Sequence, residues 1–231
     1  LRLSVKKVNL FKLEAKFLGH LITVEGLKPD PAKIEALMAY ERPRTPKQNK
    51  AFVGIVTFYR RYIRGFSTIC GPLYDVGDDK TLKWDDSKQS AFEALRTAIT
   101  RDVVLAYPDH NKEFILETDA CDYGIGGVLS QEAENGARPI AFFSKYLTTS
   151  QRNYATIQKE ALALVLAIRN FRPYIFGRKF VVYTDHQPLI WFLKKTPKSA
   201  VVHRWFLELA EYEFELKYKK GLMNGNADGL S

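Results

Sequence analysis

Two apolar runs of this sequence end in the same dipeptide, Thr-Asp. Residues 114–119 read Phe-Ile-Leu-Glu-Thr-Asp, and residues 180–185 read Phe-Val-Val-Tyr-Thr-Asp. Short apolar runs of this kind predict β-strands, so Asp119 and Asp185 each stand where a strand ends. A long crossover containing a helix joins the two strands, which makes them parallel in one sheet. We therefore expect the two aspartates to lie side by side at one sheet edge.

A third acid, Glu160, lies within a predicted helix over residues 151–170, which Ser150 would cap. The apolar face of this helix consists of Ile157, Ala161, Leu164, Val165 and Ile168. Glu160 has the spacing of that face, where a carboxylate is costly unless it is paired or bound to metal. Taken alone, Glu160 could instead lie at the solvent rim of the face. Beside two converging aspartates, a shared site is the better interpretation.

The chemistry expected of such a cluster is metal-dependent. Carboxylates in contact repel one another unless a proton or a cation lies between them. Mg²⁺ and Mn²⁺ prefer oxygen ligands, and two such ions could drive the in-line cleavage of a phosphodiester. Asp228 is a fourth candidate ligand, although an Asp before a predicted helix is most often an N-cap. His186 follows Asp185 directly, but a surface or backbone-bonded role suits it better.

The elements that must position these acids follow a mixed order of strands and helices. Strands are predicted at residues 113–118, 123–130, 137–144, 179–184 and 212–219. Helices are predicted at residues 151–170, 187–193 and 200–211. This order predicts an α/β fold on one mixed five-stranded sheet flanked by helices. The glycines after Asp119, among them Gly126 and Gly127, would allow the close approach of a substrate or of a neighbouring strand.

The first half of the chain predicts a different structure. Residues 1–28 look extended, and residues 29–110 look mostly helical. Asp30 and Pro31 begin a helix over residues 32–39, and Thr45 to Gln48 form a capping box. One face of the helix that follows the box would carry Phe52, Ile55, Val56 and Tyr59. Residues 71–73 begin another helical turn, a further helix covers residues 87–100, and we place a domain boundary near residue 110.

The net charge of +9 is confined to the N-terminal part. Residues 1–64 contain 14 Lys and Arg against 5 Asp and Glu, and the remainder is balanced. Such an excess fits a polyanion partner, although a solvated basic face would look the same. Tyr59 and Tyr62 could equally be core residues under a basic rim. The candidate nucleic-acid-binding residues are Lys47, Lys50, Tyr59, Arg60, Arg61 and Arg64.

The composition excludes several classes of protein. The only cysteines are Cys70 and Cys121, in different predicted elements, which argues against a disulfide scaffold and a cysteine-ligated zinc site and fits a reducing compartment. Apolar runs stay below the roughly 18 residues that span a membrane, so we expect no membrane partner. The first residue is Leu1 rather than Met, which suggests a fragment of a longer polypeptide.

Ordered motifs along almost the whole chain resemble one known family, the gypsy-type LTR-retrotransposon reverse transcriptases. The motifs include Phe17-Leu18-Gly19-His20, Pro29-Asp30-Pro31, Phe58-Tyr59-Arg60-Arg61-Tyr62, Gly71-Pro72-Leu73, Thr118-Asp119-Ala120, Lys159-Glu160, Thr184-Asp185-His186, Arg204-Trp205 and Asn226-Ala227-Asp228. The chain departs from the family at Cys121, where Ser is usual, and at Gly229, where Ala is usual.

The resemblance implies an RNase H-like fold in which Asp119, Glu160, Asp185 and Asp228 bind two Mg²⁺ or Mn²⁺ ions. It implies three parts: the end of a polymerase palm (1–28), a helical thumb or connection region (29–110) and an RNase H domain (111–231). The expected partners are an RNA–DNA hybrid or primer–template duplex and the remainder of the Pol polyprotein. The polymerase aspartates would lie upstream. The expected location is a cytoplasmic virus-like particle or the nucleus.

Two other interpretations stay open. The chain could be a catalytically inactive or domesticated nucleic-acid-binding remnant of a retroelement, although its intact carboxylates argue against this. It could also be a structural part of a larger reverse transcriptase that is active only in the presence of the polymerase part. The first predicts binding without cleavage of a hybrid, and the second predicts activity restored by the missing part.

Overall fold

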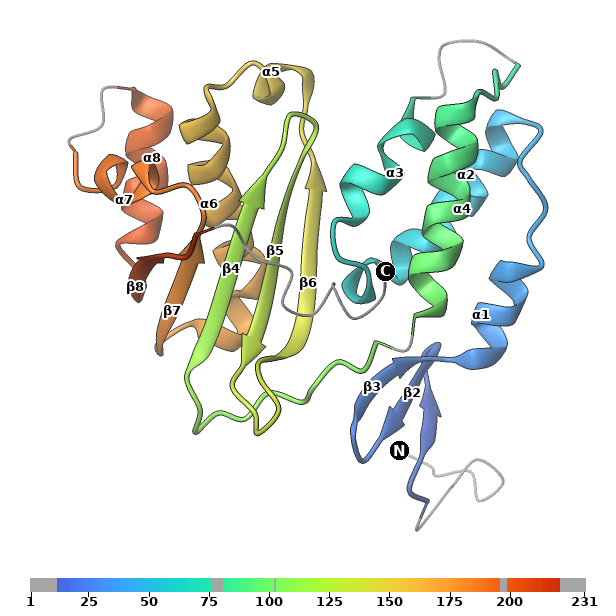
Figure 1. Cartoon of the computed structure of the whole chain (residues 1–231), viewed down its shortest axis with the longest axis horizontal. Helices are drawn as coiled ribbons and strands as arrows, with labels where there is room; N and C mark the ends of the chain where they lie inside the picture. Colours follow the sequence, from blue (N-terminus) through green and yellow to red (C-terminus); the bar gives the residue numbers. More distant parts are fainter. Residues whose placement is uncertain (1–11, 76–80, 102, 196–198, 221–231) are drawn as a thin grey trace, which may run out of the picture.

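The computed structural model describes residues 12–75, 81–101, 103–195 and 199–220, and Figure 1 shows their arrangement. A mixed five-stranded sheet and its helices form one side of the molecule. A small three-stranded sheet and helices α1 to α4 form the other side. We call residues 114–218 the sheet half and residues 15–100 the helical half.

The five-stranded sheet has the strand order β6-β5-β4-β7-β8. The strands are β4 (Phe114–Ala120), β5 (Gly124–Gln131), β6 (Arg138–Tyr146), β7 (Lys179–Thr184) and β8 (Glu213–Tyr218). Consecutive strands β4, β5 and β6 pair antiparallel, whereas β4–β7 and β7–β8 pair parallel because helical crossovers separate them. The predicted mixed sheet, and the parallel pairing of the two strands that end in Thr-Asp, are confirmed.

The helices of the sheet half are α5 (Thr149–Arg152), α6 (Thr156–Ile175), α7 (Pro188–Phe192) and α8 (Ala200–Leu209). The prediction of one continuous helix capped by Ser150 is wrong. Thr148 caps α5, and its Oγ1 accepts a hydrogen bond from the backbone N–H of Gln151. Helix α6 starts anew after Ala155, whose N–H donates to the side chain of Gln158. The break lets α6 take its own direction across the sheet.

Helix α6 covers one face of the sheet and carries its core. It contacts β4 and β5, and its inward side chains from Leu164 to Ile175 are buried with Phe114, Leu116 and Leu129. Gly127 permits this close packing, because a Cβ atom there would lie 3.1 Å from the Cβ of Ala167. The close contact holds α6 at a fixed height above the strands that carry the acidic residues.

The helical half begins with a hairpin-like sheet of β1 (Ala15–Phe17), β2 (His20–Thr23) and β3 (Gly26–Pro29). Leu27 and Leu105 exchange two backbone hydrogen bonds, of 2.8 and 3.0 Å. Gly26 has φ +147°, and a Cβ there would meet the Leu105 carbonyl oxygen, so only glycine fits. The small sheet is therefore fastened to the segment that leads into the sheet half.

The helices of this half are α1 (Pro31–Met38), α2 (Pro46–Phe58), the 3₁₀ turn η2 (Arg60–Tyr62), α3 (Phe66–Tyr74) and α4 (Asp86–Thr100). The Asp30 cap of α1 and the Thr45–Gln48 capping box of α2 are confirmed. Helix α3 begins at Phe66 and contains Pro72, so the start predicted near residue 71 is wrong. Ile55 was predicted on one face with Phe52 and Val56, yet it is 40% exposed because it lies off the buried side of α2 that carries those two residues.

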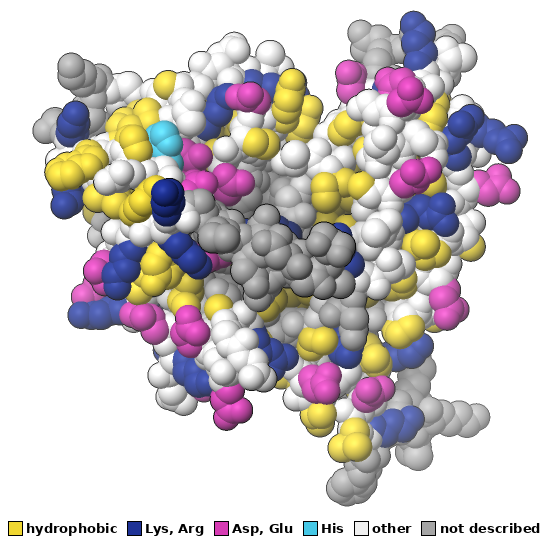
Figure 2. Space-filling view, viewed as in Figure 1, with side chains coloured by type: hydrophobic (Ala, Val, Ile, Leu, Met, Phe, Trp, Pro, Cys, Tyr) yellow, Lys and Arg dark blue, Asp and Glu magenta, His cyan; other side chains and the backbone are white. Residues whose placement is uncertain are grey.

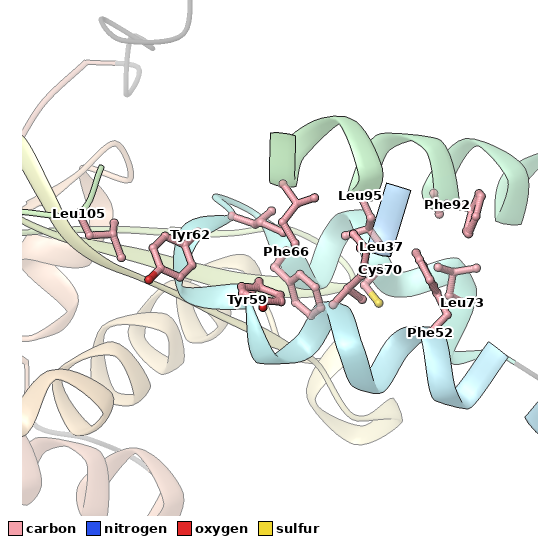
Figure 3. Close-up of a cluster of buried hydrophobic side chains, with 14 residues drawn as sticks. Leu37, Phe52, Tyr59, Tyr62, Phe66, Cys70, Leu73, Phe92, Leu95 and Leu105 are labelled. Atoms are coloured by element: carbon pink, nitrogen blue, oxygen red, sulfur yellow. The ribbon is translucent and has the colours of Figure 1, made fainter. Parts of the chain in front are cut away.

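An aromatic core joins these helices (Figure 3). Phe52, Tyr59, Tyr62 and Phe66 point into it from α2, η2 and α3, opposite Leu95 and its neighbours on α4. The rings of Phe52 and Phe92 lie 4.7 Å apart between centroids, a distance typical of favourable aromatic pairs. This core is separate from the core under α6, so each half has its own apolar interior.

The two halves meet where α3 and η2 pack against β6 and β5. The backbone N–H of Ser67 donates a buried 2.7 Å hydrogen bond to the Ser144 hydroxyl on β6. One residue further, the Thr68 hydroxyl lies 3.5 Å from the Cys121 sulfur, just after β4. The start of α3 is therefore held at the end of the sheet where Asp119 lies.

Candidate active site

Asp119 and Asp185 occupy equivalent places on neighbouring parallel strands. Asp119 is the penultimate residue of β4, and Asp185 follows the last residue of β7. In the β4–β7 register Glu117 faces Tyr183, so each aspartate lies two residues further along its strand. Both are exposed at the C-terminal edge of these strands, as the sequence predicted.

Glu160 reaches the same place from the first turns of α6. Its side chain is buried, with the residue only 4% exposed, and its Oε2 has no hydrogen-bond partner among the described residues. Each of Asp119, Glu160 and Asp185 offers a carboxylate oxygen, and these oxygens all lie within 4.8 Å of one another. The solvent-rim interpretation of Glu160 is therefore wrong, and the predicted convergence of the three acids is confirmed.

The electrostatics of the cluster oppose full ionisation. Burial, and after it the charges of Asp119 and Asp185, together raise the pKa of Glu160 to about 8, while a hydrogen bond from the Ala120 N–H acts in the opposite direction. Burial also raises the pKa of Asp119, with a further contribution from Asp185; the Ala120 N–H and the Arg64 charge act in the opposite direction. A proton on Glu160 or a cation between the acids would therefore relieve the repulsion within the cluster.

A divalent cation fits this donor set. The ligand atoms are all carboxylate oxygens, the type that Mg²⁺ and Mn²⁺ prefer. The unpartnered Oε2 of Glu160 and the raised pKa of its carboxyl are what a missing positive charge would leave behind. Asp119, Glu160 and Asp185 are thus a group that could hold a metal ion.

Lys159 and Asp122 support the cluster and were not predicted from the sequence. The Lys159 ammonium is buried and lies 2.8 Å from the Asp122 carboxylate, in the turn between β4 and β5. The pair holds the start of α6 against the residues that follow Asp119, and so helps to fix Glu160 relative to Asp119. The position of Lys159, next to Glu160 and pointing elsewhere, was visible in the sequence, but its partner depends on how the turn folds.

A recess of about 320 Å³ opens beside Asp119, between the sheet half and the helical half. Figure 2 shows a hollow between the two halves on this face of the molecule. Its helical wall consists of Arg64, Gly65, Thr68 and Ile69. Its sheet wall consists of residues 117–119, Cys121, residues 124–128, Phe143 and Ser144. The recess therefore runs from Asp119 along the face of β4 and β5 that lies opposite α6.

The predicted nucleic-acid-binding residues divide into three groups. Lys47, Lys50, Arg60 and Arg64 are exposed, and Arg61 is half-buried with its Nε enclosed. Tyr59 is only 4% exposed: its ring packs in the aromatic core, and its hydroxyl donates to the Gly19 carbonyl. Its burial contradicts the prediction that Tyr59 binds nucleic acid, and the core interpretation of Tyr59 and Tyr62 is the correct one. Arg64 lies apart from Lys47 and Lys50, in the recess beside Asp119.

Asp228, the fourth predicted ligand, lies outside the described residues. Cys70 and Cys121 are both free thiols, the first buried in α3 and the second half-buried beside Thr68. Within the described ranges, none of the helices combines the length and the apolar character needed to cross a bilayer.

Comparison with known proteins agrees with this geometry. Residues 109–212 match the RNase H-like domain found in reverse transcriptase. The fold resembles foamy viral protease-reverse transcriptase in complex with RNA/DNA hybrid, with a TM-score of 0.79 and 22% identity over 95% of this chain and 31% of that chain. A second foamy viral structure, a complex with double-stranded DNA, gives a TM-score of 0.78. The chain thus contains an RNase H-like domain of the reverse-transcriptase class.

Relatives by sequence cover the whole chain. The Pol polyprotein from transposon 297 of Drosophila melanogaster is 41% identical over all of this chain, and that from transposon gypsy is 34% identical. The chain spans only 22% and 23% of the length of these two relatives. Over its whole length the chain is thus similar to gypsy-type retrotransposon Pol polyproteins, as the sequence motifs predicted.

Proposed function

We propose that this chain hydrolyses the RNA strand of an RNA–DNA hybrid, as the RNase H portion of a retrotransposon reverse transcriptase. The observation that carries the proposal is the convergence of Asp119, Glu160 and Asp185 within 4.8 Å in an RNase H-like domain. Asp228 would be the fourth ligand. Residues 29–110 would serve as the thumb or connection region, and the polymerase site would lie in the preceding part of the parent protein.

The three acids would hold two Mg²⁺ or Mn²⁺ ions. Such ions, when bound, activate water and stabilise charge on the leaving oxygen of a phosphodiester. The residues of the chain prepare the site for them: Glu160 is buried and its Oε2 has no hydrogen-bond partner among the described residues, so this oxygen is available once the carboxyl loses its proton. The Lys159–Asp122 pair holds α6 so that Glu160 faces the strand ends. The nucleophile would be water, with no covalent enzyme intermediate.

The exposed cations of the helical half would hold the duplex. Lys47 and Lys50 on α2 and Arg60 on η2 can neutralise backbone phosphates without reading bases. Discrimination of RNA from DNA would come from contacts with the 2′-hydroxyl. The foamy viral neighbours were solved with an RNA/DNA hybrid and with double-stranded DNA, which supports a duplex as the partner.

The test is the cleavage of an end-labelled RNA–DNA hybrid with Mg²⁺ or Mn²⁺, with Asp119→Asn as the decisive variant. Loss of a supporting residue of a metal site typically costs ten- to a hundredfold in activity, so loss of a ligand should exceed about a hundredfold. Hybrid binding should stay close to that of the wild type. Glu134→Gln, in an exposed turn of the same half, is the matched control and should cleave normally.

Two outcomes would oppose the proposal. A folded wild-type chain that binds hybrid but never cuts it would support the inactive or domesticated remnant. A chain that cuts only after the preceding polymerase part is added would support a structural role within a larger reverse transcriptase. Unchanged cleavage by Asp119→Asn would show that the acidic cluster is not the site.

A further inference from the structure

Arg64 lies outside the matched RNase H-like domain, yet it borders the acidic cluster. It stands between η2 and α3 in the helical half, whereas the match covers residues 109–212. It lines the same recess as Asp119, and its positive charge acts on the Asp119 carboxyl. The helical half therefore reaches the candidate active site with one guanidinium.

The backbone that follows Arg64 is held in place by the sheet half. Gly65, with φ +64°, is the N-cap of α3, and it turns the chain directly after Arg64. Two residues later the Ser67 N–H is bonded to Ser144, and Thr68 contacts Cys121. These contacts hold the backbone beside Arg64 against the β5–β6 side of the sheet. A small movement of the two halves against each other would break them.

At Gly126, next to Asp119, the sheet wall of the recess carries no side chain. Gly126 pairs with Asp119 across β4 and β5, and a Cβ atom there would meet only the Phe143 carbonyl oxygen, at 3.7 Å. The sheet thus presents bare backbone next to Asp119. A sugar-phosphate strand could lie flat on the sheet wall with its phosphates between the acids and the helical wall.

The charge of Arg64 is available to such a strand. The side chain is exposed, and among the described residues it forms no ion pair within 4.0 Å. An arginine fork matches a phosphate better than a lysine does, because it can donate two parallel hydrogen bonds. Lys47 and Lys50, by contrast, lie on α2 and border neither the recess nor the acids.

We propose that Arg64 binds a backbone phosphate of the strand that lies across β4 and β5, so that the helical half positions the substrate at the cleavage site itself. The inference rests on the proposed function, because it assumes that a nucleic-acid strand enters this recess. It makes Arg64 a substrate-positioning residue, distinct from the cations that hold the duplex farther away. The opposing interpretation is that Arg64 serves only as a counter-charge to the acids.

The first experiment measures hybrid binding against salt in the non-cleaving Asp119→Asn background. Adding Arg64→Gln should lower the slope of log K against log[salt] by about 0.7–0.9, the value of one lost phosphate contact. Arg172→Gln is the matched control, since it removes the same charge about 18 Å along α6 from Glu160. It should leave the slope unchanged.

The second experiment measures steady-state cleavage in the otherwise wild-type chain. Arg64→Gln should lower kcat/KM about tenfold, and Arg64→Lys should recover part of the loss through charge without the fork. Isothermal titration of Mg²⁺ without nucleic acid gives the complementary readout. Tighter Mg²⁺ binding by Arg64→Gln together with an unchanged salt slope would overturn the inference in favour of the counter-charge.

The outcomes separate this inference from the proposed function. A wild-type chain that fails to cleave, with a salt slope that falls on loss of Arg64, would refute the nuclease and keep the phosphate contact. A wild-type chain that cleaves, with a slope indifferent to Arg64, would keep the nuclease and refute the contact. An equal fall in slope for Arg172→Gln would also refute a specific role for Arg64.

Discussion

The two halves of the molecule use charge in opposite ways. The helical half keeps Lys47, Lys50 and Arg60 on the surface of an aromatic core, where each is separately solvated. The sheet half draws Asp119, Glu160 and Asp185 into one cluster and buries Glu160 within it. Scattered surface charges cost the fold little, whereas a buried cluster of like charges opposes it. A bound cation would neutralise the cluster and offset this cost.

The largest expected effect is on the pH dependence of stability, when Glu160→Gln removes the buried carboxyl group. The pKa of Glu160 rises from 4.5 to about 8 on folding, so the folded state favours the protonated form. Its contribution to stability is complete below pH 4.5 and is lost as the pH rises through 8, by on the order of a few kcal/mol. Without metal, the wild type should therefore lose stability between pH 5 and pH 9, and Glu160→Gln should lose less.

Thermal unfolding of both proteins at pH 5, 7 and 9, with EDTA or Mg²⁺, checks this prediction. Mg²⁺ should raise the Tm of the wild type most at high pH, where Glu160 must otherwise carry an unpaired charge, and should raise that of the variant less. Parallel pH profiles of stability for the two metal-free proteins would mean that Glu160 is solvated. The sheet half would then not differ from the helical half in burying a charged group.

A smaller effect should separate two neighbouring glycines of β5. Gly127→Ala places a methyl group 3.1 Å from the Ala167 Cβ under α6, and overpacking of this kind costs about 1–3 kcal/mol. Gly126→Ala points into the recess, so it should leave stability unchanged or slightly raised while it slows hybrid cleavage. Denaturant unfolding and cleavage assays on both variants test whether one glycine affects stability and the other affects cleavage. Equal losses of stability would show that Gly126 is also a packing residue.

The smallest effect should come from the helical half. Replacing Lys47 and Lys50 together with Gln should lower the salt slope of hybrid binding by about 2 if each contacts one phosphate. Stability should change by less than about 0.5 kcal/mol, because both side chains are exposed. Fluorescence anisotropy over a salt series measures the slope. If the double variant kept the salt slope of the wild type, Lys47 and Lys50 would be ordinary solvated residues without phosphate contacts.

The sequence predicted most of the sheet half because its signals are local and agree with one another. The Thr-Asp strand ends, the crossover helix and the spacing of Glu160 together dictated that three acids meet. Two predictions failed where several local signals competed: Ser150 lies two residues after the true cap Thr148, and Gly71-Pro72 looked like a helix start although α3 tolerates Pro72 in its last turn. Both errors concern boundaries rather than the presence of an element.

The errors about which side chains are buried or in contact have a different physical origin. Tyr59 and Arg64 lie five residues apart in one basic aromatic run, and composition cannot tell which will face the core. The turn through η2 and Gly65 buries Tyr59 and sends Arg64 to the recess. The Asp122–Lys159 pair was missed for the same reason, since it joins residues whose proximity depends on tertiary packing.

Phe142 on β6 gives the junction of the halves a further meaning. Its ring packs against the aromatic core of the helical half rather than under α6. Strand β6 therefore contributes side chains to the apolar cores of both halves. Cutting the chain near residue 110 would expose this ring and leave the Ser144 hydroxyl without its Ser67 donor. The RNase H-like domain is therefore not freely portable: an exchange of the helical half between relatives would have to supply a matching surface for β6.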